Sequence, residues 1–154
     1  MKESNSLNQV AEFHKTFKHP IEKSPIIPSK QRSDLRVSLL VEEVKELQQA
    51  IEDNNLVEVA DALCDIQYVL AGAILEFGLA DKFKDLFDEV HRSNMSKACK
   101  SEEEANQTIA HYKAKDDSDS YFKEEDSLFL VYRTKDDKTL KSINYSPADL
   151  VSIL

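Results

Sequence analysis

The chain has 154 residues, enough for one domain, and its 29 Asp and Glu against 20 Lys and Arg give a formal net charge of −9. This charge argues against a general nucleic-acid surface, which needs a basic patch, and no apolar run approaches the roughly 18 residues that a membrane span requires. The two glycines, Gly72 and Gly78, lie outside any glycine-rich phosphate loop, which excludes Walker-type and Rossmann-type nucleotide binding.

The N-terminal part of the chain is predicted to be helical. Its first residues, MKESNSLNQVAEF, lack the apolar core of a signal peptide, so the expected location is the cytoplasm. Residues 6–18 have apolar positions at helical spacing, and three prolines then predict an extended connection. A long helix over 33–53 follows. Its apolar positions repeat at three- and four-residue steps and indicate one core-facing stripe: Val37, Leu40, Val44, Leu47 and Ile51.

Two further helices complete the predicted bundle. Asn55 followed by Glu58 resembles a capping box, which places the start of the third helix near Leu56, and Gly78 is a natural stop signal. A fourth helix is predicted from about 81 to 95. The apolar residues of the third helix are predicted to be buried: Val59, Leu63, Cys64, Ile66, Leu70 and Ile74.

The residues after 100 have a different pattern. Ser101 with Glu104 predicts a short helix to about Lys113, and LFLVYR is the strongest strand signal. Turn-like segments on either side of it predict a hairpin or a three-stranded meander, and NYSPADLVSIL indicates a docked tail. The expected fold is an all-α bundle of four to five helices with a small C-terminal hairpin and an extended tail. Residues 1–100 form the main bundle, and the helix, short hairpin and docked tail of 101–154 complete the same domain.

Acidic residues concentrate on the two central helices. At about 100° per residue, Glu43 and Glu46 fall on one helix face, and Glu58, Asp61 and Asp65 form one stripe on the next helix. Helices joined by a two-residue break pack antiparallel, which can bring the two patches together. Carboxylates gathered in this way stay ionised only when cations neutralise them, and all-oxygen ligands suit Mg²⁺ or Mn²⁺.

Each of these features also has a structural explanation. Acid-rich helix faces are commonly solvated surface, and Glu58 alone could serve as a helix cap partner. Asp116, Asp117 and Asp119 lack the glycine and the terminal glutamate of a calcium loop and are predicted to form a solvated turn. The four histidines are scattered, and none is assigned a catalytic role.

Together the motifs resemble those of a known superfamily. The pattern Glu43-x-x-Glu46, then Glu58-x-x-Asp61 after a short gap, resembles the all-α nucleoside triphosphate pyrophosphohydrolases, and Glu42 gives the EExxE form of MazG-like proteins. The segments EVADALCDIQYVLAGAILEFGL, DEVHRSNMSK and LKSINYSPADL look like a subgroup related to phosphoribosyl-ATP pyrophosphohydrolases. The resemblance covers roughly 35–97 and 139–154, and it implies a helical bundle of the MazG-like type.

The resemblance also implies roles for individual residues. Four acids would hold the magnesium ions that bind the triphosphate: Glu43, Glu46, Glu58 and Asp61. Glu42 would orient or deprotonate the attacking water, and Asp65 would support a ligand or a bound water. Residues at the end of the fourth helix and in the tail would contact the substrate: Arg92, Asn94, Lys97, Asn144 and Tyr145. The first three could instead simply close a helix C-terminus, and Phe13 and Tyr68 could stack on a base or serve only as packing.

The implied reaction is hydrolysis of a nucleoside triphosphate to the monophosphate and pyrophosphate, which would remove modified or surplus nucleotides. The resemblance further implies a homodimer or homotetramer. Two alternatives stay open at this point: a phosphoribosyl-ATP pyrophosphohydrolase, and a non-enzymatic acidic helical module that binds a protein partner. The second predicts no magnesium dependence and no effect of Glu43→Gln.

Overall fold

A computed structural model gives the structure of the chain and describes residue 2 and residues 4–154. Within these residues it has five helices and one antiparallel two-stranded hairpin, which confirms the predicted all-α class with a small C-terminal hairpin. The chain divides into two compact units, Met1–Lys84 and Asp85–Leu154. The boundary between the two units lies inside the fourth helix. Among the described helices, none combines the length and apolar character that a membrane crossing needs.

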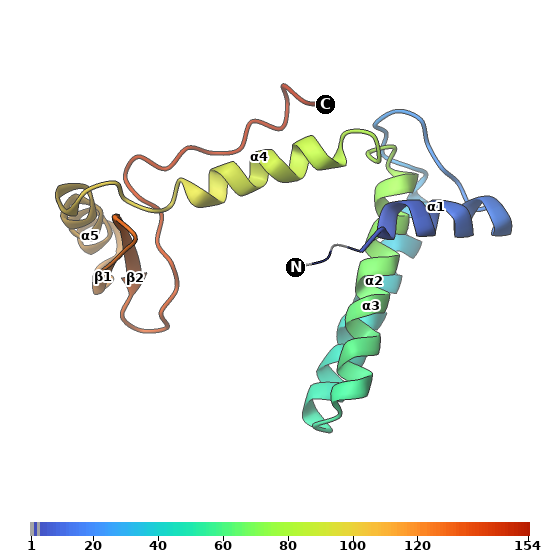
Figure 1. Cartoon of the computed structure of the whole chain (residues 1–154), viewed down its shortest axis with the longest axis horizontal. Helices are drawn as coiled ribbons and strands as arrows, with labels where there is room; N and C mark the ends of the chain where they lie inside the picture. Colours follow the sequence, from blue (N-terminus) through green and yellow to red (C-terminus); the bar gives the residue numbers. More distant parts are fainter. Residues whose placement is uncertain (1, 3) are drawn as a thin grey trace. The chain divides into compact units, whose positions relative to one another are not determined.

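The first unit contains α1 (Ser6–Phe17), α2 (Lys30–Glu52) and α3 (Leu56–Glu76). Figure 1 shows α2 and α3 side by side as a long antiparallel hairpin, and α1 packs against α3. The Ser29 hydroxyl accepts a hydrogen bond from the Arg32 amide, so α2 begins three residues earlier than the predicted Ser33. Asn55 caps α3 as predicted, since its side-chain oxygen accepts from the amides of Val57 and Glu58.

The end of α3 is fixed by the segment that connects α1 to α2. Glu22 and Ile26 donate backbone hydrogen bonds to the carbonyls of Leu75 and Phe77, each at 3.0 Å. Gly78 then turns away from the helix with φ 66°, and a Cβ built there would lie 1.9 Å from the Ser24 carbonyl oxygen. Glycine is therefore required at position 78 for both its backbone conformation and its lack of a side chain.

We expect Gly78→Ala to destabilise the first unit by about 2 kcal/mol, because an L-residue at positive φ is strained and the neighbouring backbone must also move. Thermal unfolding monitored by circular dichroism would measure the change. A melting temperature equal to that of the wild type would show that this turn is not held as described.

Several residues that were predicted to be buried in the helical core are exposed in the single chain. Along α2, Val37 is 62% exposed, Val44 54% and Ile51 61%, while Leu63 and Cys64 on α3 are also exposed. The buried side chains along these two helices include small ones, Ala50 on α2 and Ala62 on α3, while the buried Ala71 packs with Val10 of α1 and with Leu75. A helical hairpin has two broad faces, and the long apolar residues here lie on a face that no helix of the first unit covers.

The second unit contains most of α4 (Phe83–Met95), with α5 (Glu102–Asp116), β1 (Ser120–Glu125) and β2 (Leu128–Arg133). Ser101 caps α5 as predicted, and β2 matches the predicted LFLVYR strand. The hairpin turns at Asp126 and Ser127, both at positive φ. In place of a third strand, two isolated bridges involve β2, one between Tyr132 and Thr139 and one between Phe129 and Cys99. The small core of this unit consists of Cys99, Ala105, Val131 and Leu140.

Candidate active site

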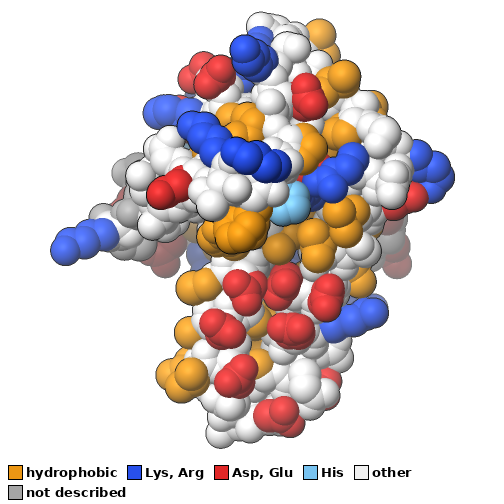
Figure 2. Space-filling view, turned by 90° about the vertical axis from the view of Figure 1, so that its right-hand side faces the viewer, with side chains coloured by type: hydrophobic (Ala, Val, Ile, Leu, Met, Phe, Trp, Pro, Cys, Tyr) orange, Lys and Arg blue, Asp and Glu red, His pale blue; other side chains and the backbone are white. Residues whose placement is uncertain are grey.

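The predicted acids lie along one stretch of the α2–α3 hairpin. Arg36 on α2 approaches Gly72 on α3, so counting along antiparallel helices brings Glu43 to the level of Asp65 and Glu46 to the level of Asp61. Glu58 lies about one helical turn beyond. Figure 2 shows acidic side chains gathered over this part of the molecule, bordered by apolar side chains and a histidine.

The charges of these acids are not neutralised by the protein. In the part of the chain that the structure describes, no hydrogen bond or ion pair reaches any of the following carboxylates: Glu42, Glu43, Glu46, Glu58, Asp61 and Asp65. The capping explanation for Glu58 is not realised, because the Asn55 amide donates to the Ala50 carbonyl instead. Two helices thus present a row of unneutralised negative charge.

Glu43 is the most constrained member of the row. It is half-buried, and its Oε2 is buried with no hydrogen-bond partner among the described residues. Burial raises the pKa of this carboxyl, and four neighbouring carboxylates raise it further: Glu46, Asp65, Glu42 and Asp61. A buried carboxylate oxygen without a donor is costly. Its environment therefore favours either a proton or a bound cation.

The acids have the right chemistry for a hard divalent cation but are not yet in ligand geometry. Among the described residues, no three His, Cys, Asp or Glu side chains are grouped closely enough to hold a metal ion. Carboxylate oxygens are nonetheless the donors that Mg²⁺ prefers, and Mg²⁺ commonly uses only one or two of them together with waters and phosphate oxygens. The carboxylates of the row could therefore bind Mg²⁺ after rotation of their side chains toward a common ion.

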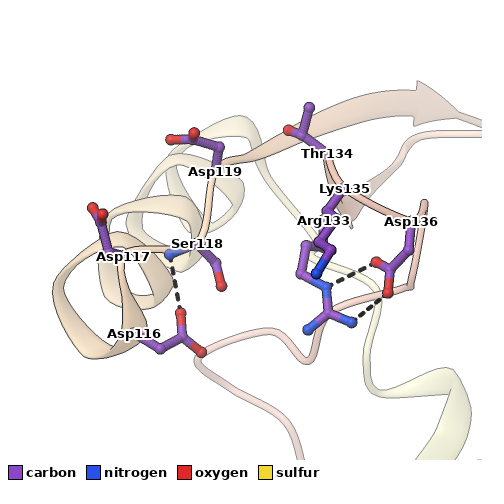
Figure 3. Close-up of a pocket in the computed structure, with 8 residues that line it drawn as sticks. All are labelled: Asp116, Asp117, Ser118, Asp119, Arg133, Thr134, Lys135 and Asp136. Carbon is purple, nitrogen blue, oxygen red and sulfur yellow. Dashed lines mark hydrogen bonds and ion pairs between the residues drawn. The ribbon is translucent and has the colours of Figure 1, made fainter.

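A second group of acids, in the other unit, provides a useful contrast. Asp116, Asp117 and Asp119 line a cavity of about 520 Å³ together with Arg133 and Asp136 (Figure 3). Here the charges are matched by local partners. Lys113 pairs with Asp117 at 2.7 Å and with Asp119 at 3.0 Å, and Asp116 accepts from the Ser118 amide. These contacts agree with the predicted solvated turn.

An aromatic pocket lies next to the acidic row, in the same unit. It has a volume of about 240 Å³ and is lined by Val10, Phe13, His14, His19, Leu35, Arg36, Leu39, Tyr68, Val69 and Gly72. The Phe13 and Tyr68 rings make a T-shaped contact with their centres 5.6 Å apart, and Phe13 stacks on His19 with a centre-to-centre distance of 5.8 Å. Leu39 precedes Glu43 by one turn, about 6 Å along α2, and Tyr68 follows Asp65 by a similar step on α3. The pocket and the acids are therefore neighbours along the α2–α3 hairpin.

The buried end of this pocket carries an ion cluster that the sequence did not predict. Glu76 is 1% exposed and accepts hydrogen bonds from Arg32 Nε, at 3.0 Å, and from the Nη2 atoms of Arg32 and Arg36. Burial alone would raise the pKa of Glu76, but the hydrogen bonds from the two arginines lower it overall. A lone Glu within the apolar run AGAILEFGL was the available signal that a buried partner exists.

His14 was also missed as a site residue. It is 2% exposed, and its Nδ1 lies 2.8 Å from the Pro20 carbonyl oxygen. Since a carbonyl can only accept, Nδ1 carries the proton in the neutral ring and Nε2 is left as an acceptor. Burial lowers the pKa of His14, and the nearby positive charge of Arg36 lowers it further. Its position on the apolar stripe of α1 was the only sequence signal.

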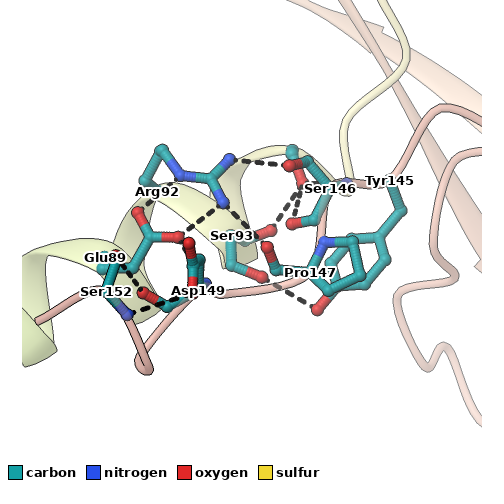
Figure 4. Close-up of polar contacts among 9 residues, drawn as sticks. Glu89, Arg92, Ser93, Tyr145, Ser146, Pro147, Asp149 and Ser152 are labelled. Atoms are coloured by element: carbon teal, nitrogen blue, oxygen red, sulfur yellow. Dashed lines mark hydrogen bonds and ion pairs between the residues drawn. The ribbon is translucent and has the colours of Figure 1, made fainter. Parts of the chain in front are cut away.

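Arg92, predicted to contact substrate, holds the C-terminal tail against α4 (Figure 4). Its guanidinium pairs with Glu89 at 2.7 and 2.8 Å and donates to Ser146 Oγ and the Pro147 carbonyl. Glu89 in turn accepts from the Asp149 amide. The pKa of Glu89 is lowered to about 2, first by Arg92 and then by that amide. These contacts support a structural role, so substrate binding by Arg92 stays a prediction.

The other four predicted substrate residues lie close to this junction within the second unit. Lys97 Nζ donates to Asn94 Oδ1 at 2.7 Å, and the Tyr145 hydroxyl is 2.8 Å from Ser93 Oγ. Lys141 Nζ lies 4.1 Å from the centre of the Tyr145 ring. The bond to Ser93 and the positive charges of Lys141 and Lys97 lower the pKa of Tyr145. The Asn144 amide donates to Ser142 Oγ. Their contact with substrate also stays a prediction.

We expect Arg92→Ala to release the tail from α4, because it removes the donors to Ser146 and Pro147 and leaves Glu89 without its partner. Amide hydrogen exchange of residues 145–150 should become at least several-fold faster. Arg133→Ala is the control, since Arg133 pairs locally with Asp136. Unchanged exchange in Arg92→Ala would show that the tail docks without this arginine.

Two comparisons with known proteins indicate the family of the chain. A family model described as phosphoribosyl-ATP pyrophosphohydrolase matches residues 10–94, which include α2, α3 and every acid of the row. The chain is also 26% identical to an uncharacterized protein of Acanthamoeba polyphaga mimivirus, in an alignment that covers 86% of the chain and 89% of the viral protein. The family match spans more than half of the chain, and the chain therefore belongs to the phosphoribosyl-ATP pyrophosphohydrolase family.

Proposed function

We propose that the protein is a magnesium-dependent pyrophosphohydrolase of nucleoside triphosphates. The observation that carries the proposal is the row of carboxylates on α2 and α3 without protein partners, centred on the half-buried Glu43. A negative surface of this kind repels a polyphosphate unless cations lie between them. The family match supports a pyrophosphohydrolase, and the nature of the triphosphate and the metal are our inference.

Each acid would have a distinct task in this site. The magnesium ligands would be Glu43, Glu46, Glu58 and Asp61, with Asp65 supporting one of them or a bound water. Bound magnesium would neutralise the phosphate oxygens and stabilise the charge that develops on them. Glu42 is exposed beside Glu43 and would accept a hydrogen bond from the attacking water, orienting it toward the phosphorus atom.

The aromatic pocket would hold the base of the nucleotide. Its volume of about 240 Å³ is below the roughly 300–1,000 Å³ of sites for drug-sized ligands, so it suits one ring system and not a whole nucleotide. Phe13 and Tyr68 are 36% and 40% exposed and line its open end. With the base in this pocket, the triphosphate would extend along the hairpin toward Glu43.

A second candidate substrate comes from the family itself, whose description names phosphoribosyl-ATP. The same acids and pocket could bind its triphosphate and its base. Hydrolysis of phosphoribosyl-ATP in preference to all simple triphosphates would favour this candidate.

We also propose that the chain forms a homodimer or a homotetramer. The apolar face of the α2–α3 hairpin, which includes Val37, Val44, Ile51 and Leu63, is too long and too exposed for an isolated chain. Packing of two such hairpins would give a four-helix core. Sedimentation analysis would test this proposal, and a monomer at micromolar concentration would contradict it.

The catalytic proposal is tested by pyrophosphate release from a panel of common and modified nucleoside triphosphates and phosphoribosyl-ATP, with protein stripped of divalent cations and then supplied with Mg²⁺ or Mn²⁺. We expect release that depends on the added metal for at least one substrate. No release from any substrate, together with identical behaviour of Glu43→Gln, would instead favour a non-enzymatic binding module.

A further inference from the structure

We propose that Arg36 and His14 select bases that carry a carbonyl group next to a ring N–H, as in 6-oxopurines and 4-oxopyrimidines, over their amino counterparts. The inference rests on the proposed function and extends it to the choice of base. The two side chains are 7% and 2% exposed, whereas Phe13 and Tyr68 are more open, so they form the buried end of the pocket.

The ion cluster at this end has two guanidinium groups, of Arg32 and Arg36, for the single carboxylate of Glu76. Arg32 alone engages both oxygens of Glu76, through Nε and Nη2. Arg36 adds a second buried guanidinium to the same carboxylate, and its Nε has no hydrogen-bond partner among the described residues. Burying an extra charge without a full set of partners is costly. A hydrogen-bond acceptor in the pocket would offset this cost.

Gly72 allows the donor and the acceptor to lie together. A Cβ at this position would be 2.8 Å from Arg36 Nη1 and 3.1 Å from His14 Nε2, so both atoms lie beside the same point of α3. The carbonyl of Pro20 fixes the tautomer in which Nε2 accepts. The pocket wall therefore presents a donor from Arg36 next to an acceptor from His14.

This donor–acceptor pair complements one class of base edge. Hypoxanthine, guanine and uracil present a carbonyl acceptor beside a ring N–H donor. Adenine and cytosine present an amino donor beside a ring nitrogen acceptor, which places donor against donor at Arg36 and acceptor against acceptor at His14. Mispaired polar groups in a buried site reject a ligand strongly.

The test compares kcat/KM for two pairs of substrates that differ in this edge, ITP against ATP and UTP against CTP. We expect the oxo member of at least one pair to be preferred by about 10- to 100-fold. Arg36→Gln should reduce this preference to within about threefold. Arg32→Gln is the matched control, because Arg32 binds the same carboxylate but does not line the pocket, and it should retain the preference.

Two outcomes overturn the inference: equal kcat/KM within both wild-type pairs, or the same preference in a folded Arg36→Gln protein. If Arg36→Gln does not fold, the wild-type ratios alone decide. If no triphosphate is hydrolysed, the proposed function fails separately, and the pocket is then tested by calorimetry with IMP against AMP and UMP against CMP. Equal affinities in both pairs, or no binding, would then overturn the inference.

Discussion

Glu43→Gln is expected to lower kcat/KM for any triphosphate substrate by at least about 100-fold while leaving the protein folded. Glutamine has the same shape but removes one negative charge and one strong oxygen donor from the proposed metal site, and changes at metal sites commonly cost this much even outside the ligand shell. Glu52→Gln is the matched control, since Glu52 is an exposed acid on the same helix and accepts a hydrogen bond from Gln48. A Glu43→Gln enzyme with wild-type activity would remove Glu43 from the mechanism.

In the absence of metal, the same substitution should increase the stability of the folded protein at neutral pH, although it lowers activity. A carboxyl whose pKa is raised on folding takes up a proton, so its contribution to stability falls as the pH rises through that pKa. Bound Mg²⁺ would reverse this loss. At one hundred times its dissociation constant a ligand stabilises by about 2.7 kcal/mol, or roughly 5–10 °C here. We expect a larger Mg²⁺-induced shift at pH 7.5 than at pH 5, and little shift in Glu43→Gln.

Glu76→Gln is expected to destabilise the protein by about 3–5 kcal/mol, the usual cost when one member of a buried ion cluster is removed. The variant leaves two guanidinium groups of the first unit without a counter-charge. The side chain of Arg32 is partly buried, and that of Arg36 is almost fully buried. Chemical denaturation at pH 7 would measure the loss. Glu22→Gln, at an exposed position, is the control and should change stability little.

The effect of Glu76 should depend on pH with a defined sign. Because its pKa is lowered on folding, its contribution is complete above the usual value near 4.5 and is lost as the pH falls through the lower folded value. The difference in stability between wild type and Glu76→Gln should therefore narrow below about pH 4.5. A difference that is constant from pH 7 to pH 3 would contradict the ion cluster.

The helices could be predicted because their signals are local. Asn55, Ser101 and Gly78 act through hydrogen bonds and backbone angles within a few residues, so the starts of α3 and α5 and the end of α3 follow from the sequence. Ser29 is a cap of the same kind, but the prolines before it concealed that α2 begins there. The two-stranded hairpin follows equally from LFLVYR and its turn.

The site could be predicted only in part. Helical periodicity placed the acids on one side of each helix, and the antiparallel hairpin then brought Glu43 to the level of Asp65. The cluster of Arg32, Arg36 and Glu76 depends on pairing across some forty residues, which no periodicity reveals. The apolar residues of α2 were expected inside the chain because periodicity identifies an apolar face but not what covers it.

The position of phosphate cleavage tests the central claim most directly. Phosphorus NMR of a triphosphate that the protein hydrolyses, incubated with protein and Mg²⁺, should show the monophosphate and pyrophosphate appearing together, and neither when the metal is chelated or when Glu43→Gln replaces the wild type. Formation of the diphosphate and orthophosphate, or product formation that is unaffected by chelation and by Glu43→Gln, would contradict the assignment of this acidic hairpin as a pyrophosphohydrolase site.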